Sequence, residues 1–458
     1  MKRGIVSLIA LGAVVQVAFA AAERKPNIVF IVADAMGYAD CGVQGCRDVP
    51  TPSLDALANE GVRFTDGYVS GSVCSPSRAA LVTGRYQQRD GLYDWIQAGG
   101  RGLDPNVPTI ADYLRKAGYR TALVGKWHLG EQDACHPLNR GFDEFFGFLG
   151  GGRSYFPDNQ VVKQKGHSYT RLVRGREPVV ETEYMTYAFG REAVAFVNRQ
   201  KDRAQPFFLY LAFNAVHTPL QAPKDIGKRF EAIQDPKRRS YAGMLWAMDE
   251  AIGRVMKALR DAGMEENTLV CFISDNGGPI TRNSPNASSN TPLRGGKGET
   301  WEGGIRVPFF MRWTGHLKAG RTYTQPVIQM DFTVTALALA GAVMDAKWLM
   351  DGVDLMPFLQ GAEGEPHRFL YWDCPTNGKQ WAIRQGKWKL TYALPEKTSK
   401  PVLGLYDLSQ DVMEERDRSA EQPELVKELQ ATWAEWSKGN KVIAPLAKAA
   451  GHLAGQVE

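Results

Sequence analysis

Four short apolar runs along the chain have the composition of buried β-strands. Each is continuous rather than alternating, and each is rich in branched or aromatic residues. Runs of this kind are typical of strands that are covered on both faces of a sheet. They occupy residues 27–33, 121–126, 207–213 and 268–274.

Helical spacing appears between these runs. Pro52 follows Thr51 and opens a predicted helix by a cap and a first-turn proline. A second helix carries a core-facing stripe of Leu245, Met248, Ile252, Val255 and Leu259. The alternation predicts an α/β fold with a largely parallel sheet between two helical layers. Functional residues are then expected where the strands end.

The pattern changes near Glu365. Residues 368–373, 380–394 and 403–408 read as short antiparallel strands, and residues 423–436 as an amphipathic helix. We therefore divide the chain into a signal peptide (1–20), a catalytic domain (21–364) and a C-terminal subdomain (365–458).

The first twenty residues resemble a secretory signal. Lys2 and Arg3 precede an apolar run, and Ala18 to Ala20 form a small-any-small cleavage pattern. We expect export to a periplasm or to the outside, with no stable membrane insertion. An uncleaved anchor is the alternative.

The 458 residues, 44% hydrophobic, suffice for a large core, and a net charge of +5 is too small to indicate nucleic-acid binding.

Six cysteines are too few for a disulfide scaffold in an exported chain of this length. Cys41 and Cys46 are close enough in sequence to pair, although two free thiols are equally compatible. There is no Cys-x-x-Cys pair to indicate zinc.

Cys74 opens the most informative segment, residues 74–84. Pro76 prevents a preceding helix and Arg78 begins an Ala/Leu-rich run, so the thiol is expected where a loop enters a helix. Free backbone donors and the positive helix end lower a thiol pKa at such a place. The alternative is a small buried apolar side chain.

This segment resembles the signature of the type I, formylglycine-dependent sulfatases, and the flanking sequences look like relatives of arylsulfatase A and N-acetylgalactosamine-6-sulfatase. The matching positions are Cys74, Pro76, Ser77, Arg78, Leu81, Thr83 and Gly84. The resemblance implies an alkaline-phosphatase-like α/β/α sandwich. It also implies that a formylglycine-installing enzyme converts Cys74, and that Arg78 holds the modified side chain.

Oxygen-bearing side chains follow two of the predicted strands. Asp34 ends the first, and Asp275 and Asn276 end the fourth. Such ligands suit calcium or magnesium. The resemblance implies one calcium ion, bound together with formylglycine 74. The family has two consecutive aspartates at the first strand end, and here the second is Ala35. Asp40 or an extra water is a possible replacement.

Four further side chains match the family. Lys126 and His128 follow the second strand two residues apart, hence on one side if extended. By resemblance Lys126 binds the sulfate and His128 removes a proton from the sulfated hydrate. His217 would contact the sulfate or protonate the leaving oxygen, and Lys297 would reach the bridging oxygen. We expect these residues to converge from four strand ends.

The resemblance therefore implies a sulfuric ester hydrolase that acts on sulfated polysaccharides or oligosaccharides. Aromatic and basic loop residues either line a sugar site or simply pack: Trp95, Arg101, Arg153, Tyr155 and Trp301. A phosphonate or phosphate monoester hydrolase of the same fold is one alternative. A non-catalytic sulfoglycan-binding relative, suggested by Ala35, is another.

Overall fold

The computed structural model describes residues 24–157, 171–280, 285–375, 378–395 and 400–441. In these residues the largest sheet has ten strands. Their order is β11 (Arg321–Tyr323), β2 (Val62–Phe64), β10 (Phe309–Arg312), β9 (Thr268–Ser274), β1 (Asn27–Ala33), β8 (Phe207–Ala212), β4 (Arg120–Lys126), β5 (Glu144–Phe148), β6 (Val173–Arg174) and β7 (Glu177–Pro178).

The centre of this sheet confirms the parallel arrangement predicted from the apolar runs. β1 pairs in parallel with β8 and β9, and β4 pairs in parallel with β8 and β5. β10 runs antiparallel to β9 and β2. The carboxyl ends of β1, β4, β8 and β9 therefore meet at one edge of the sheet.

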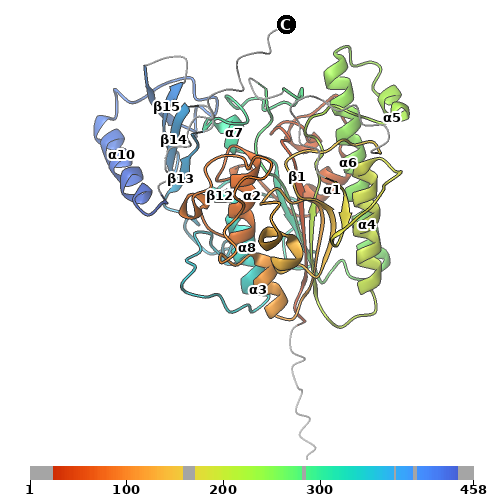
Figure 1. Ribbon diagram of the computed structural model, residues 1–458. Coiled ribbons are helices and arrows are strands. Elements are labelled where there is room, and N and C mark those ends of the chain that lie inside the picture. Colours follow the sequence, from red (N-terminus) through yellow and green to blue (C-terminus); the bar gives the residue numbers. More distant parts are fainter. Residues whose placement is uncertain (1–23, 158–170, 281–284, 376–377, 396–399, 442–458) are drawn as a thin grey trace, which may run out of the picture.

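Helices cover both faces of the sheet (Figure 1). One layer contains α1 (Pro52–Asn59), α4 (Met185–Gln200), α5 (Lys224–Arg229) and α6 (Pro236–Asp261); the other contains α2 (Cys74–Thr83), α3 (Ile110–Lys116) and α8 (Gln329–Leu339). Along β1, Val29 and Ile31 face the first layer, while Ile28, Phe30 and Val32 face the second. The predicted stripe from Leu245 to Leu259 packs into the first core.

The start of α1 differs from the prediction. Thr51 makes no side-chain cap, and its hydroxyl instead donates to Asp55. The carboxylate of Asp249, on α6, accepts the amides of Ser53 and Leu54 at 3.0 and 2.8 Å. Burial raises the pKa of Asp249 to about 6. The free donors of the helix are thus satisfied by a residue almost 200 positions away.

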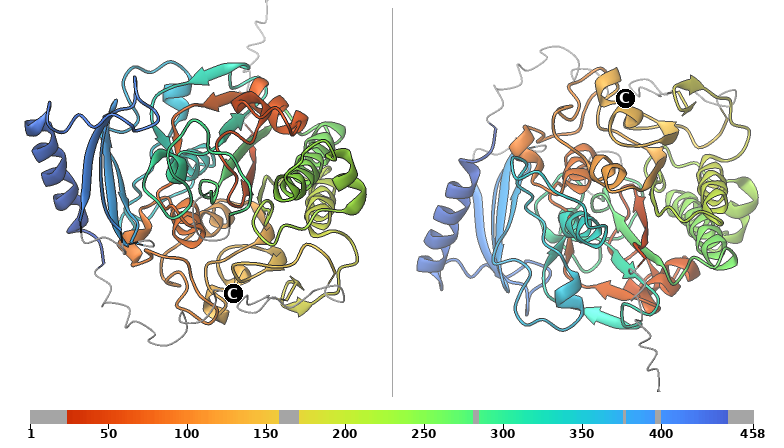
Figure 2. Two further views of the ribbon diagram at one scale, coloured as in Figure 1. Left: turned by 90° about the horizontal axis from the view of Figure 1, so that it is seen from above. Right: turned by 90° about the horizontal axis from the view of Figure 1, so that it is seen from below.

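The C-terminal subdomain has the predicted form. β13 (Leu370–Asp373), β14 (Gly378–Gln385), β15 (Trp388–Pro395) and β16 (Val402–Asp407) form an antiparallel sheet, and α10 (Pro423–Ser437) packs on it. Trp433 of α10 stacks on Trp381 with ring centroids 4.6 Å apart. Figure 2 shows this sheet standing against the main body, with α10 on its outer side.

The short elements lie in the connections: β3 (Gly67–Tyr68), β12 (Val327–Ile328), α7 (Glu302–Ile305), α9 (Met356–Leu359) and single 3-10 turns at 42–44, 87–90, 133–135 and 137–139.

Residues 1–20, assigned to the signal peptide, lie outside the described residues. Within the described ranges, no helix combines the length and apolar character needed to cross a bilayer. All six cysteines are described and all are free thiols, so the possible Cys41–Cys46 pair is not formed.

Candidate active site

Cys74 is the first residue of α2, as the loop-to-helix prediction required. Its side chain is buried, and every residue of the ten-residue helix is buried with it. The hydroxyl of the adjacent Ser75 accepts the amide of Ile96 at 3.0 Å, which fastens the loop around residue 96 to the helix start. The thiol therefore occupies a fixed position at a helix N-terminus.

Arg78, one turn further along α2, is completely buried and lies against three strand ends. Its Nε donates to Oδ2 of Asp275 at 2.8 Å, and its Nη1 donates to the carbonyl of Lys126 at 3.2 Å. Its Nη2 lies 3.9 Å from Asp34. Burial opposes the charged form, but the carboxylates of Asp275 and Asp34 raise the pKa of Arg78 above its usual value. The guanidinium thus holds α2 against the ends of β1, β4 and β9.

The ammonium of Lys126 donates to Oδ2 of Asp34 at 2.7 Å. Both side chains are buried. A buried ion pair needs such partners because an isolated charge in the interior is costly. The contact joins the ends of β1 and β4, which β8 separates in the sheet.

The possible metal ligands leave two oxygens without hydrogen bonds. They are Oδ1 of Asp34 and Oδ1 of Asn276, both buried. Asp275 is more engaged, because its Oδ1 accepts the amide of Ala35 at 3.0 Å while its Oδ2 binds Arg78. Unpartnered buried oxygens fit a hard cation. The set holds only two carboxylates, and within the described residues no cluster of three or more His, Cys, Asp and Glu side chains suits a metal.

Ala35 is buried in a left-handed conformation, with φ of 58°. Non-glycine residues rarely adopt this region, and aspartate and asparagine do so more readily than alanine. The methyl group adds no donor to the site. Position 35 is thus one at which the backbone favours a short polar side chain but the sequence supplies an apolar one.

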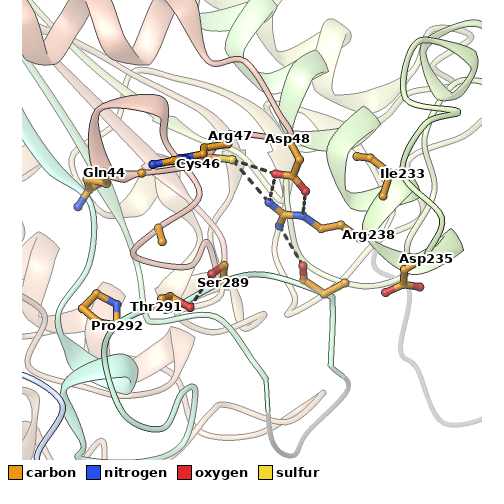
Figure 3. A pocket seen from close by; sticks show the side chains of 13 residues that line it. Gln44, Cys46, Arg47, Asp48, Ile233, Asp235, Arg238, Ser289, Thr291 and Pro292 are labelled. Carbon is orange, nitrogen blue, oxygen red and sulfur yellow. Dashed lines mark hydrogen bonds and ion pairs between the residues drawn. The ribbon is translucent and has the colours of Figure 1, made fainter.

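Asp40, the suggested replacement ligand, is engaged elsewhere. It accepts hydrogen bonds from Arg238 at 2.8 Å and from Tyr241 at 2.6 Å. Arg238 also binds Asp48 and borders a cavity of about 700 Å³ (Figure 3). The cavity is lined partly by Gln44, Arg47, Asp48, Asp235, Arg238 and Thr291. The Asp40 carboxylate is therefore held by Arg238 and Tyr241 and does not compensate for Ala35.

His128 lies two residues after Lys126 in sequence but not on an extended strand. β4 ends at Lys126, and His128 has a left-handed φ of 58°, so the extended geometry that would place both side chains on one side is not formed. Its Nε2 lies 3.0 Å from the carbonyl of Ile96, and its Nδ1 has no hydrogen-bond partner. A Cβ at Gly151 would lie 2.7 Å from Nε2, so any larger residue there would have to displace the imidazole ring.

His217 follows β8 in a turn whose backbone carbonyls are bound by Tyr155. Its Nδ1 lies 2.7 Å from the carbonyl of Thr218. The hydroxyl of the buried Tyr155 donates to the carbonyls of His217 and Asn214, at 2.8 and 2.5 Å. Tyr155 thus packs beneath the site and does not line a sugar site.

Lys297 reaches the site from the loop between β9 and α7, not from a strand end as expected. Its side chain is 7% exposed. Burial disfavours its charge, but the neighbouring Cys74 and the carboxylates of Asp34 and Asp275 outweigh this and raise the pKa of Lys297. The loop is bonded to the turn before Cys74, because Gly298 donates its amide to the carbonyl of Ser72 at 2.8 Å.

The electrostatics tie these groups into one site. Burial, together with the charges of Lys126, Arg78 and Lys297, lowers the pKa of His128 well below its usual value. Burial, Lys297 and Lys126 do the same for His217. Three cations (Arg78, Lys126 and Lys297) surround two carboxylates (Asp34 and Asp275). All five of these residues are buried and together carry one net formal positive charge, which suits a tetrahedral anion.

The other loop residues considered for a sugar site differ in how exposed they are. Trp95 is 49% exposed and Arg101 is also exposed, whereas Arg153 is buried. Trp301 is partly buried and packs against Arg294 and Tyr406.

Asn214, which sequence reasoning missed, is buried with neither side-chain atom hydrogen-bonded. A polar residue directly after an apolar strand was the available signal.

Comparison with known proteins places the site in context. The Sulfatase family model matches residues 26–342, and the model for the C-terminal region of N-sulphoglucosamine sulphohydrolase matches residues 297–438. N-acetylgalactosamine-6-sulfatase of Mus musculus is 34% identical over 370 residues, which are 77% of this chain and 70% of that protein.

Two solved structures are similar over nearly the whole chain. Ps i-CgsB in complex with k-i-k-neocarrahexaose has 38% identity and a TM-score of 0.85, covering 91% of this chain and 94% of that one. The PsFucS1 sulfatase from Pseudoalteromonas sp. has 28% identity and a TM-score of 0.77, covering 92% of each chain.

Proposed function

This chain belongs to the type I sulfatase family and is a sulfuric ester hydrolase, and we propose that it removes sulfate from sulfated polysaccharides or their oligosaccharides through a formylglycine made from Cys74. The observation that carries this proposal is the position of Cys74. It begins the buried helix α2 and interacts electrostatically with Arg78 and Lys297, and Arg78 also donates to the carbonyl of Lys126.

The cations would neutralise the sulfate oxygens as charge develops in the transition state. The modified residue 74 offers a hydroxyl that attacks sulfur while the ester oxygen leaves with a proton. Lys297 can donate a proton because the carboxylates of Asp34 and Asp275 favour its charged form, whereas the lowered pKa of His217 keeps that imidazole neutral. His217 then serves as a hydrogen-bonding contact to the sulfate.

His128 suits the second half of the cycle. Its pKa is lowered, so the ring is neutral at physiological pH, and its Nδ1 is unpartnered. A neutral imidazole with a free ring nitrogen can accept the proton of the second hydroxyl, after which sulfate departs and the aldehyde re-forms.

We propose that Asp34, Asp275, Asn276 and formylglycine 74 hold one Ca²⁺ ion. Bound there, the ion would acidify the attacking hydroxyl and neutralise the sulfate. Affinity should be low. The protein groups around it already carry a formal charge of +1, from three cations and two carboxylates, and calcium affinity falls with fewer ligand charges.

The substrate class rests on two similarities. Ps i-CgsB is described in complex with a neocarrahexaose, and several curated relatives are N-acetylgalactosamine-6-sulfatases. Carrageenan-type oligosaccharides and N-acetylgalactosamine 6-sulfate are therefore the first substrates to test. The signal-like residues 1–20 lead us to propose a periplasmic or secreted location, which N-terminal sequencing of the exported protein tests.

Sulfate release is the direct test. Protein made in a host that installs formylglycine should liberate inorganic sulfate from the substrate panel and from an aryl sulfate. Cys74→Ala should abolish release, whereas Cys135→Ala, which removes another buried thiol, should not. A protein that binds the sulfated sugars in excess calcium but releases no sulfate would overturn the proposal, as would preferential cleavage of aryl phosphate.

A further inference from the structure

The loop that carries Lys297, residues 294–301, forms backbone hydrogen bonds with the catalytic domain on one side. Lys297 donates its amide to the carbonyl of Gly278 at 3.2 Å, just after the metal-ligand pair at the end of β9. Gly298 donates its amide to Ser72, two residues before Cys74. The backbone at Lys297 is therefore aligned with both the nucleophile and the end of β9.

The C-terminal subdomain forms hydrogen bonds with the same loop on its other side. Gln380 of β14 is 5% exposed. Its Nε2 donates to the carbonyl of Gly298 and its Oε1 accepts the amide of Thr300, each at 3.3 Å. The hydroxyl of Thr391, on β15, lies 3.3 Å from that of Thr300. Gly298 thus lies between Ser72 and Gln380, and its neighbour Lys297 has little backbone freedom.

Buried charges anchor both flanks of this loop to the subdomain. Lys389 of β15 binds Glu302 at 2.9 Å and Glu414 at 2.8 Å. The carboxylate of Glu414 accepts the amide of Glu302 at 2.8 Å, and its carbonyl accepts Nη1 of Arg294 at 2.7 Å. Arg294 and Glu302 bracket the loop. The C-terminal subdomain therefore fixes where the loop begins and where it ends, and Gln380 contacts the part between.

We propose that Gln380 is a positioning residue that places Lys297 over the leaving oxygen, and that the C-terminal subdomain is the frame for this placement. The inference rests on the proposed function, which assigns proton donation to Lys297. A lysine side chain has four rotatable bonds, so its reach depends on a fixed backbone. A displacement of about 1 Å at a catalytic group can cost about a hundredfold in rate.

The test uses Gln380→Met, which keeps the length of the side chain but removes both hydrogen bonds. Gln200→Met is the matched control, because Gln200 is also buried but lies at the end of α4. Among the described residues its side chain hydrogen-bonds only to Phe196, within its own helix. Both variants are assayed with aryl sulfates whose phenols span a range of pKa values.

A misplaced proton donor should slow esters of weakly acidic phenols most, because acidic phenols leave without a proton. We expect Gln380→Met to lower kcat about tenfold for the poorest leaving group, with little loss for the best. Lys297→Ala should steepen the same dependence further. A merely destabilising change, as in Gln200→Met, lowers all rates equally.

Amide hydrogen exchange of residues 295–301 gives a readout that needs no activity. Exchange should be faster in Gln380→Met than in the wild type and unchanged in Gln200→Met. Unchanged exchange, or a leaving-group dependence equal to that of the wild type while Lys297→Ala steepens it, would overturn the inference. A wild-type protein that releases no sulfate would instead overturn the proposed function, leaving loop placement to be decided by exchange alone.

Discussion

Nζ of Lys126 lies 2.7 Å from Oδ2 of Asp34, although β8 separates the strands that deliver these two side chains. The ammonium occupies one oxygen of a carboxylate that the proposed calcium ion also needs. Lysine and metal therefore compete for the same charge.

This competition predicts opposite effects of Lys126→Met on metal binding and on catalysis. Removal of the cation frees Asp34 and lowers the positive charge of the site, so calcium should bind more tightly, by about tenfold. Sulfate hydrolysis should fall at least a hundredfold, because a ligand of the sulfate oxygens is lost. Calorimetric titration with Ca²⁺ measures the first effect. Lys387→Met, a half-exposed control, should leave both unchanged, and weaker calcium binding in Lys126→Met would contradict the competition.

Ala35→Asp should strengthen calcium binding. Position 35 is already left-handed, where aspartate is better tolerated than alanine, and a third carboxylate offsets the positive charge of the site. We expect a larger calcium-induced rise in melting temperature than in the wild type. Ala35→Asn has the same backbone preference without the charge. An equal calcium-induced rise in melting temperature in both variants would therefore show that a better-tolerated left-handed backbone, not ligand charge, is responsible.

The acidic limb of the pH profile should lie below pH 6.5. Burial and the charge of Lys126 lower the pKa of His128, so the base remains neutral until the pH falls well below the usual histidine value. Activity should then be lost only as the pH falls further. His128→Gln should lower kcat and remove this limb. A wild-type limb with a midpoint above pH 6.5 would contradict the assignment.

Glu414→Gln should stabilise the protein at alkaline pH. Burial raises the pKa of Glu414 to about 7, above the unfolded value near 4.5, and the nearby Glu302 carboxylate adds to the shift. The folded state therefore binds more protons, and stability is lost as the pH rises through about 7. At pH 5 the melting temperature of Glu414→Gln should equal that of the wild type. At pH 8.5 it should be about 1 to 3 °C higher. A larger gain at pH 5 would reverse the sign and refute this account.

Much of the fold was predictable because its signals are local. Each central strand is one continuous apolar run, and the β14–β15 hairpin and α10 carry period-two and helical patterns that later packing did not override. The predictions that failed depend on distant partners. Asp249 displaced Thr51 as the cap of α1, and Arg238 engaged Asp40, each from almost 200 residues away.

The site was predictable to the extent that its residues follow strands directly. Asp34, Lys126 and Asp275 do so, and they meet. His128 turned out to lie in a left-handed turn against Gly151, and Lys297 in a long loop held by Gln380. Neither periodicity nor residue spacing encodes such placements, because they depend on glycine backbone geometry and on contacts with another subdomain.

Mass spectrometry of the peptide that contains Cys74 tests the central claim most directly. The protein should be made in a host with the formylglycine-installing enzyme, and sulfate release should be assayed on the same sample. We predict that residue 74 has lost its sulfur and carries an aldehyde, and that the converted fraction is proportional to activity. An intact thiol at residue 74 in a fully active preparation would contradict the account.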